Sequence, residues 1–146
     1  MVKALTLAEL IQHSPRLIEA APQLRRNRPV DVEGFVRRWR AWFLSDRGCV
    51  WGYWHQQTLM GSLGAVLSED LYDGLPIAVE LFWNVRPEGR QQSGWRRLFS
   101  AYEQWAQARG ARSVYLTHWE HSDPRMGRLF ARYGFHCDER AYRKEL

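Results

Sequence analysis

The start of the chain carries a hydrophobic and polar pattern typical of a helix N-terminus, with Leu5 and Leu10 at the positions of a hydrophobic staple. Thr6 is followed three residues later by Glu9, the pattern of a capping box, so a helix is predicted to begin at Leu7. Ser14-Pro15 predicts the end of that helix and the start of another one, which runs to about Ala21, because proline is tolerated at a first helical position. The arginine-rich segment that follows is predicted to be a loop.

A further helix is predicted after Asp31, whose side chain can cap its first turn. Gly48 is predicted to end this helix, because glycine is favoured just past a helix C-terminus. The hydrophobic positions between them recur at helical spacing, at Val32, Phe35, Val36, Trp39 and Phe43.

The middle of the chain changes to the pattern of strands. Cys49–Trp54 and Leu59–Leu67 are separated by the polar residues 55–57, which predicts a hairpin. After a turn-rich loop over 68–74, Ile77–Val85 alternates most regularly, and Pro87 is predicted to end it. The alternation places Ile77, Val79, Leu81, Trp83 and Val85 on one face, with Ala78, Glu80, Phe82 and Asn84 on the other.

Helix and strand patterns alternate in the last third. A helix is predicted from Gly94 to Gly110 and a strand over Ser113–Trp119. Asp123 is then predicted to cap a helix whose first residue is Pro124. The buried stripe of this helix is predicted to consist of Met126, Leu129, Phe130 and Tyr133, and the final strands are predicted at Phe135–Asp138 and Ala141–Lys144.

This order of elements predicts a single domain over residues 1–146. The fold class is α/β (α+β), with a mixed, mostly antiparallel central sheet flanked by helices. Hydrophobic residues make up 45% of the chain and charged residues 25%, a composition typical of a globular domain.

Several classes of protein are disfavoured by the composition. Cys49 and Cys137 are the only cysteines, which argues against a disulfide scaffold and structural zinc, and no metal site is predicted. The apolar runs are too short for a signal peptide or a membrane span, so we expect a cytoplasmic protein without a membrane partner. The net charge of +5 favours an anionic partner, although a solvated basic surface accounts for it equally well.

Residues 83–95 form the most informative segment. A buried strand leads into a loop and then a helix N-terminus, where free N–H groups and the helix dipole favour phosphate. The segment resembles the pyrophosphate loop of the Gcn5-related N-acetyltransferase (GNAT) family, in which a strand ending V-x-P leads to Q/R-x-x-G-x-G/A and a helix. The matching residues are Val85, Pro87, Arg90 and Leu98.

The end of the chain resembles the same family. Asp123-Pro124-Arg125, Leu129-Phe130 and Tyr133-Gly134-Phe135 are similar to its N-P-x-A-x-x-L-Y-x-x-x-G-F pattern. The resemblance covers about residues 51–146, and no first strand of the family's sheet is evident before Thr6. It implies an acyl-CoA N-acyltransferase-like fold and acetyl-CoA, or another acyl-CoA, as co-substrate. The residues that it implies for cofactor binding are Trp83, Asn84, Val85, Arg90, Gln91, Gln92, Ser93, Gly94, Trp95 and Asp123.

The chain departs from the family pattern at several positions, so we expect a degenerate acetyl-CoA loop. Ser93 and Trp95 stand where the family has two small residues, and a register shifted by one residue uses Gly94 but introduces Arg96. Phe130 replaces the tyrosine that, in many members, protonates the departing thiolate. Tyr133, one helical turn later, is the candidate to donate this proton instead. The alternative is that Tyr133 is a core residue. Asp123 stands where the family has an asparagine. Its carboxylate would repel an anionic cofactor beside it, unless Asp123 serves only as a helix cap.

Direct transfer to an amine needs a group that removes the ammonium proton. Glu80, on the central strand, is the candidate base, against the alternative of a structural carboxylate. His118 and Glu120 are second candidates, because ligand sites gather at the carboxyl ends of strands.

The resemblance favours an acyl-CoA-dependent N-acetyltransferase that acts on an unidentified amine by direct transfer. The alternative is a catalytically inactive protein of the same fold, a binding or assembly factor for a protein or nucleic acid, which the departures motivate. The helix predicted after Asp31 also carries basic residues interleaved with tryptophans, namely Arg37, Arg38 and Arg40 with Trp39 and Trp42. This pattern is compatible with a nucleic-acid partner, because basic residues bind phosphates and aromatic rings stack on bases. The alternative is that the arginines form a solvated face.

Overall fold

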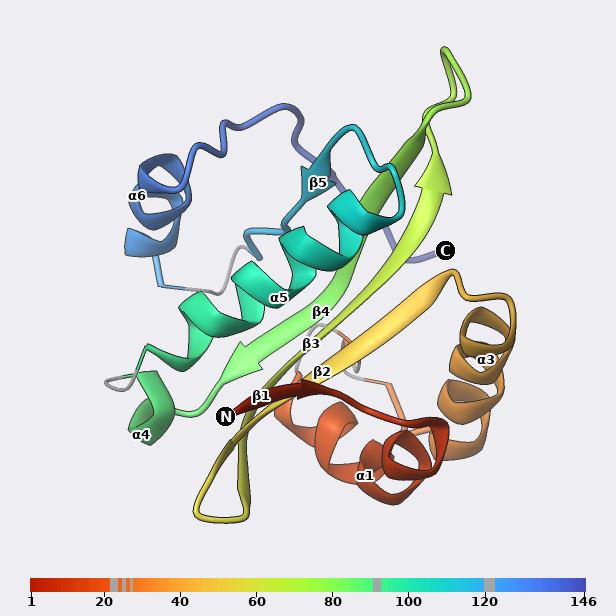
Figure 1. The fold of residues 1–146 in the computed structure, drawn as a ribbon, viewed down its shortest axis with the longest axis vertical. Helices are drawn as coiled ribbons and strands as arrows, with labels where there is room; N and C mark the ends of the chain where they lie inside the picture. The colour runs from red at the N-terminus through yellow and green to blue at the C-terminus, as the bar shows by residue number, and fades with distance from the viewer. Residues whose placement is uncertain (22–23, 25, 27, 91–92, 120–122) are drawn as a thin grey trace.

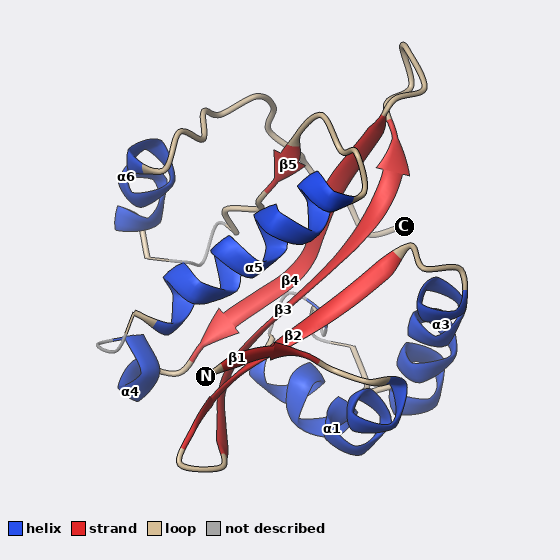
Figure 2. Ribbon diagram, viewed as in Figure 1, coloured by secondary structure: helices blue, strands red, loops and turns tan. Residues whose placement is uncertain are grey.

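The computed structural model describes residues 1–21, 24, 26, 28–90, 93–119 and 123–146, and shows a five-stranded sheet in the order β1-β2-β3-β4-β5 (Figure 2). Neighbouring strands are antiparallel except β4 and β5, which are parallel, so the predicted mixed, mostly antiparallel sheet is confirmed. The strands are β1 (Val2–Ala4), β2 (Gly48–His55), β3 (Thr58–Glu69), β4 (Pro76–Val85) and β5 (Val114–Tyr115). The helices are α1 (Leu7–Ala20), α3 (Val32–Leu44), α4 (Pro87–Arg90), α5 (Gly94–Ala108) and α6 (Arg125–Arg132).

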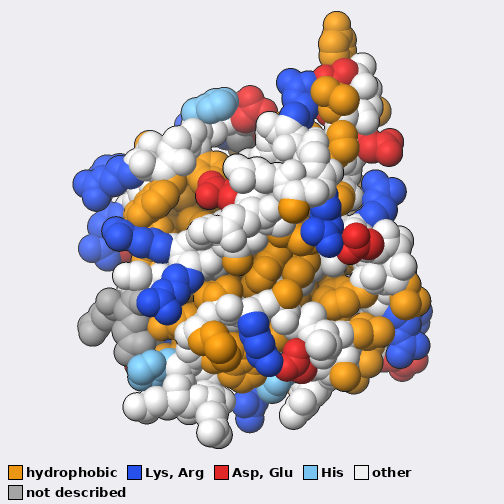
Figure 3. All heavy atoms as spheres, in the orientation of Figure 1, with side chains coloured by type: hydrophobic (Ala, Val, Ile, Leu, Met, Phe, Trp, Pro, Cys, Tyr) orange, Lys and Arg blue, Asp and Glu red, His pale blue; other side chains and the backbone are white. Residues whose placement is uncertain are grey.

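The helices cover the two faces of the sheet in separate layers. α1 and α3 pack on one face, and α5 crosses the other, with α6 beyond it (Figure 1). Each layer has its own core. Leu10, Leu17, Phe35 and Trp39 bury the first face, and Leu98, Phe99 and Tyr102 bury the second. Figure 3 shows basic side chains gathered over α6, whose sequence is RMGRLFAR.

The start of α1 confirms the predicted capping box. The Glu9 N–H donates to the Thr6 hydroxyl and the Thr6 N–H to the Glu9 carboxylate. The predicted break at Pro15 is wrong, because α1 continues through it. Proline has no N–H for the carbonyl of Ile11, and the Ser14 hydroxyl donates to that carbonyl instead, at 2.9 Å.

The boundaries of α3 agree with the predicted cap but not with the predicted end. The Asp31 carboxylate accepts from the Gly34 N–H at 2.8 Å and begins the helix. The helix ends at Leu44, four residues before Gly48, which starts β2.

Sequence reasoning missed β1. This strand pairs antiparallel with β2, through Val2 with Tyr53, Lys3 with Gly52 and Ala4 with Trp51. Three residues are too short to show a periodic pattern, and their pairing depends on a partner about fifty residues away.

A β-bulge in β4 changes which side chains share a face. Ala65 of β3 pairs with Glu80 and Gly64 with Phe82, so Leu81 has no opposing residue. Glu80 therefore lies on the α5 face with Trp83, and Phe82 lies on the α1 face. The uninterrupted alternation predicted for this strand is wrong beyond Leu81.

The last predicted strands are shorter or absent. Of Ser113–Trp119 only Val114–Tyr115 pairs with β4, and Phe135–Asp138 and Ala141–Lys144 have no regular secondary structure. Most of the tail is exposed, and Phe135 is its partly buried residue that packs against the core. An alternation of apolar and polar residues stabilises a strand only when one face of the strand is buried, so it does little for an exposed segment.

Candidate functional site

A buried carboxylate lies where β4 and β5 separate. The two strands pair at Ala78 with Val114 and at Val79 with Tyr115. At the next position the Glu80 side chain takes the place of a backbone partner, and its Oε2 accepts from the Thr117 N–H at 2.8 Å. Glu80 is 3% exposed, so the strands are joined there by an ionisable group inside the protein.

Burial controls the protonation of this carboxylate. Removal of water disfavours the charged form and raises the pKa of Glu80 to about 7, although the hydrogen bonds from Thr117 partly oppose the shift. A carboxylic acid with a pKa near neutrality exchanges protons readily at physiological pH, as a general base must. The predicted base is therefore in an environment that suits the role.

Tyr102 of α5 fixes the neighbouring part of β5. Its hydroxyl donates to the carbonyl of Tyr115 at 3.1 Å, and the residue is fully buried. Burial raises the pKa of Tyr102 above its usual value, so the hydroxyl stays protonated as a donor. This bond holds β5 against α5 beside the carboxylate of Glu80.

The segment after β4 folds back tightly. The Arg86 N–H donates to the Met60 carbonyl at 2.8 Å, and α4 follows where a loop was predicted. The Arg90 Nε donates to the carbonyl of Val85 at 3.0 Å, which holds the guanidinium against the end of β4. Gln91 and Gln92, both predicted to bind the cofactor, lie outside the described residues.

Ser93 and Gly94 form the start of α5. Ser93 is exposed in the left-handed region, with a φ of 60°. Gly94 is buried, and a Cβ there would lie 2.2 Å from Cε1 of Tyr53. Packing therefore requires glycine at 94. The Arg96 and Arg97 N–H groups of the first turn of α5 both donate to the Ser93 carbonyl, at 3.0 and 3.3 Å.

Trp95 belongs to an aromatic cluster between α5 and α6. Its ring lies edge-on to Tyr133, with 5.4 Å between centroids, and the guanidinium of Arg96 stacks over it at 5.1 Å. Phe99 connects this ring to Trp83 of β4, at 5.9 Å from the first and 5.2 Å from the second. The Trp95 indole therefore packs against Tyr133, at the end of α6.

The two aromatic residues at the end of α6 have opposite environments. Phe130 is buried and contacts Trp83, with 6.2 Å between ring centroids. Tyr133 follows the last helical residue and is 42% exposed, so its predicted place in the buried stripe is wrong. His118, a second candidate, packs edge-on against Phe130 at 6.1 Å, and Glu120 lies outside the described residues.

The charge of Asp123 is balanced within its own turn. Its Oδ1 accepts from the Arg125 N–H at 2.9 Å, and the guanidinium of Arg125 also donates to this carboxylate. These bonds lower the pKa of Asp123 to about 2. The helix begins at Arg125, one residue later than predicted, and Pro124 precedes it.

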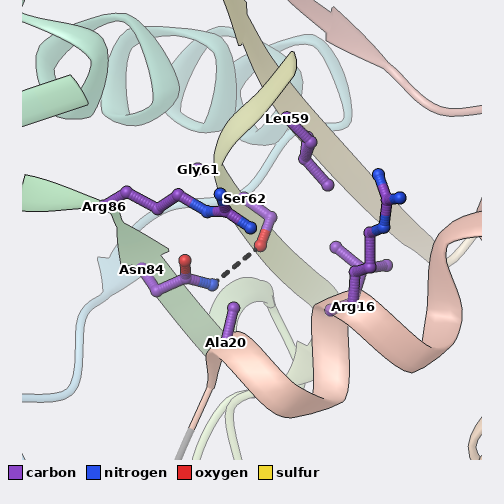
Figure 4. A pocket seen from close by; sticks show the side chains of 8 residues that line it. Arg16, Ala20, Leu59, Gly61, Ser62, Asn84 and Arg86 are labelled. Carbon is purple, nitrogen blue, oxygen red and sulfur yellow. Dashed lines mark hydrogen bonds between the residues drawn. The ribbon is translucent and has the colours of Figure 1, made fainter. Parts of the chain in front are cut away.

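Asn84 points to the other face of the sheet. Its Nδ2 donates to the Ser62 hydroxyl at 2.9 Å, beside a pocket that Arg16 and Arg86 also line (Figure 4). Its side chain is therefore on the α1 side, away from α5. Sequence reasoning identified neither Ser62 nor the two arginines, since no motif connects them.

The described part of the chain contains no group of acidic, histidine or cysteine side chains that could hold a metal ion. Among its helices, none has the length and apolar character needed to cross a membrane.

Solved structures share this fold over the whole chain. A transcriptional regulator from Bacillus halodurans C-125 matches with a TM-score of 0.78 and 16% identity, covering 100% of this chain and 99% of that one. The aminoglycoside acetyltransferase AAC(6')-Iy, solved with a bisubstrate analogue, matches with a TM-score of 0.76 and 18% identity, covering 100% and 98%. A ribosomal-protein-alanine N-acetyltransferase from Brucella melitensis biovar Abortus 2308 has a TM-score of 0.73 and 16% identity, covering 100% and 99%.

Sequence comparison identifies the family. No curated protein matches this chain. The model of the Acetyltransferase (GNAT) family matches residues 16–135, which is most of the chain. The chain therefore belongs to the GNAT acetyltransferase family.

Proposed function

We propose that this chain transfers an acetyl group from acetyl-CoA directly to an amine, with Glu80 as the base. The observation that carries the proposal is the buried Glu80 carboxylate at the separation of β4 and β5, with a pKa raised to about 7. GNAT proteins use acyl-CoA, and the N-terminus of α5 is the kind of helix end whose backbone N–H groups and dipole favour phosphate.

The residues that we assign to cofactor binding lie both before and after α4 in the sequence. The backbone of Trp83, Asn84 and Val85 would contact the pantetheine arm along the open edge of β4. The pyrophosphate would lie at the start of α5, against Ser93, Gly94 and Trp95, with Arg90, Gln91, Gln92 and Asp123 around it. Asp123 suits this place because Arg125 balances its charge.

The reaction forms a C–N bond and breaks a C–S bond. Glu80, directly or through one water, accepts the ammonium proton, and the neutral amine then attacks the acetyl carbonyl. Coenzyme A leaves as the thiolate, and Tyr133 donates the proton that it takes up. The exposure of Tyr133 allows its hydroxyl to exchange protons with water.

A second function is a binding or assembly factor without catalysis. The cluster of Trp95, Arg96 and Tyr133 favours it, because these side chains pack together at the start of α5, where a pyrophosphate would bind. A nucleic-acid surface on α3 is not supported in the same way. Trp39 is 2% exposed and cannot stack on a base.

Calorimetric titration with acetyl-CoA separates these functions. Micromolar binding by the wild type supports the transferase. Absence of binding by the wild type, with binding by Trp95→Gly, supports the binding factor, because the indole would then block the site. Thermal unfolding of Trp95→Gly serves as the control for its folding.

A further inference from the structure

The segment that follows β5 is held by side chains of β4 and α5. β5 pairs with β4 only at Val114 and Tyr115, and α5 lies across this part of the sheet (Figure 1). Two residues beyond the last pair, the backbone of Thr117 contacts two side chains of β4, Glu80 and Trp83. Side chains therefore hold the chain here in place of backbone pairing.

The two β4 side chains bind the backbone of Thr117 on both sides of its Cα. The Thr117 N–H donates to Glu80 Oε2 at 2.8 Å, and the Thr117 carbonyl accepts from Trp83 Nε1 at 3.5 Å. The second bond is long and weak by itself. The Trp83 ring is fixed by Phe99, whose ring lies edge-on to it with 5.2 Å between centroids. Trp83 therefore restricts the chain next to the bond that Glu80 accepts.

The third contact on this segment comes from α5. The fully buried Tyr102 donates its hydroxyl to the carbonyl of Tyr115 at 3.1 Å. That carbonyl lies two residues before Thr117, so Tyr102 and Trp83 hold the chain on opposite sides of the Thr117 N–H. Thr117 is itself exposed, so the packing of its own side chain does little to keep it in place.

The position of the Thr117 N–H affects how readily Glu80 carries a charge. Glu80 is 3% exposed, so water solvates the carboxylate poorly and burial raises its pKa. The hydrogen bonds from Thr117 favour the charged form and lower the pKa. A shift of Thr117 away from β4 would remove this support.

Other titratable groups lie on the elements packed around Glu80. They are Cys49 of β2, Tyr102 and Glu103 of α5, and His118 after β5. Burial raises the pKa of the Cys49 thiol and of the Tyr102 hydroxyl, so both stay neutral near pH 7. Among the residues that the structure describes, no charged side chain contributes to the pKa of Glu80, which leaves Thr117 as the neighbour that supports its charge.

We propose that Tyr102 and Trp83 are positioning residues for the base. By holding the chain on either side of the Thr117 N–H, they keep this donor on the Glu80 carboxylate. The inference rests on the proposed function, in which Glu80 accepts the proton of the amine. It assigns the role to the tyrosine hydroxyl and the indole N–H, whereas the backbone of Trp83 is assigned to acetyl-CoA.

NMR tests this positioning without any substrate. The carboxyl carbon signal of Glu80, identified by its loss in Glu80→Gln, is followed against pH in the wild type, Tyr102→Phe and Trp83→Phe. Both substitutions keep an aromatic ring and remove one donor. We expect the pKa of Glu80 to rise by about 0.5 or more in Tyr102→Phe, because a weaker bond from Thr117 supports the charged form less. The rise should be smaller in Trp83→Phe, whose bond is the longer one.

Hydrogen exchange of the Thr117 N–H gives a second measurement at a fixed pH. Exchange should be about threefold faster or more in each of the two variants, since each loses one bond beside this N–H. Trp105→Phe is the matched control, because it removes an indole N–H from α5 whose ring packs edge-on against Trp51 of β2. An equal acceleration in Trp105→Phe, or a pKa of Glu80 that is unchanged or lowered in Tyr102→Phe, would overturn the inference.

The pH profile of kcat/KM for acetyl transfer connects the positioning to the reaction. In Tyr102→Phe its midpoint should move to higher pH by the same amount as the NMR midpoint. A merely structural role would lower kcat/KM at every pH and leave the midpoint in place. A kinetic midpoint that stays while the NMR midpoint moves would contradict the proposed function, because Glu80 would then not be the base. An NMR midpoint that stays would overturn the positioning role alone.

Discussion

The carboxylate of Glu80 accepts the backbone N–H of Thr117 at 2.8 Å, at the position where β4 and β5 stop pairing. A side chain here replaces the ladder bond between two parallel strands. The same atoms therefore hold the sheet together and place an ionisable group at its opening. A substitution that preserves the hydrogen bond to Thr117 is needed to distinguish the structural role of Glu80 from its role as a base.

Glu80→Gln is such a substitution. Glutamine keeps an oxygen that accepts from Thr117 but cannot take a proton, so kcat/KM for acetyl transfer should fall about 100-fold. In the wild type, kcat/KM should rise with pH through about 7, the pKa of Glu80, and the variant should lose this step. Glu33→Gln, exposed on α3, is the control. Unchanged turnover in Glu80→Gln would rule out the base assignment.

The same carboxylate should make stability depend on pH. Its folded pKa of about 7 exceeds the ordinary value of 4.5, so between these values the folded state binds more protons than the unfolded state. The free energy of unfolding should therefore decrease as pH rises from about 4.5 to about 7, by at most roughly 3 kcal/mol. Urea unfolding at pH 5 and pH 8 measures this change. Glu80→Gln should have a smaller change, and an equal change in both proteins would assign it to other groups.

Gly94→Ala should destabilise the protein. The added Cβ would lie 2.2 Å from Cε1 of Tyr53, whose buried ring has little room to move, and overpacking of this kind costs about 1–3 kcal/mol. Gly127→Ala in α6 is the matched control, because its Cβ would lie 3.7 Å from Nδ1 of His118, an ordinary contact. It should be neutral or stabilise by up to about 1 kcal/mol, since alanine is the better helix former. Equal midpoints of chemical unfolding for the two variants would contradict the packing argument.

Tyr133→Phe tests the proton donor for the thiolate. The ring contact with Trp95 is kept, so the free energy of unfolding should change little, while kcat should fall about tenfold or more. Tyr142→Phe, at a residue that is 90% exposed, is the control. An unchanged kcat would show that the proton comes from another group, and His118→Ala would then be the next variant.

The sequence by itself determined those elements whose signals are local. The capping box at Thr6, the Asp31 cap and the strand pattern of β4 act over a few residues, and α1, α3 and β4 begin at, or within one residue of, the positions that these signals predict. Gly94 at the start of α5 was also predicted, since the change from strand to helix periodicity occurs there. Family membership followed from motifs in the same local stretches.

Only the tertiary structure decided the features that depend on distant partners. β1 forms because β2 has a free edge, and the bulge at Leu81 arises from pairing with β3, so the face of Glu80 could not be derived from alternation alone. Pro15 stays within α1 because Ser14 satisfies the carbonyl that proline leaves free. The pocket between α1 and β4 likewise joins side chains that no local pattern connects. Long-range packing brings these groups together, and periodicity in one segment carries no information about its partner.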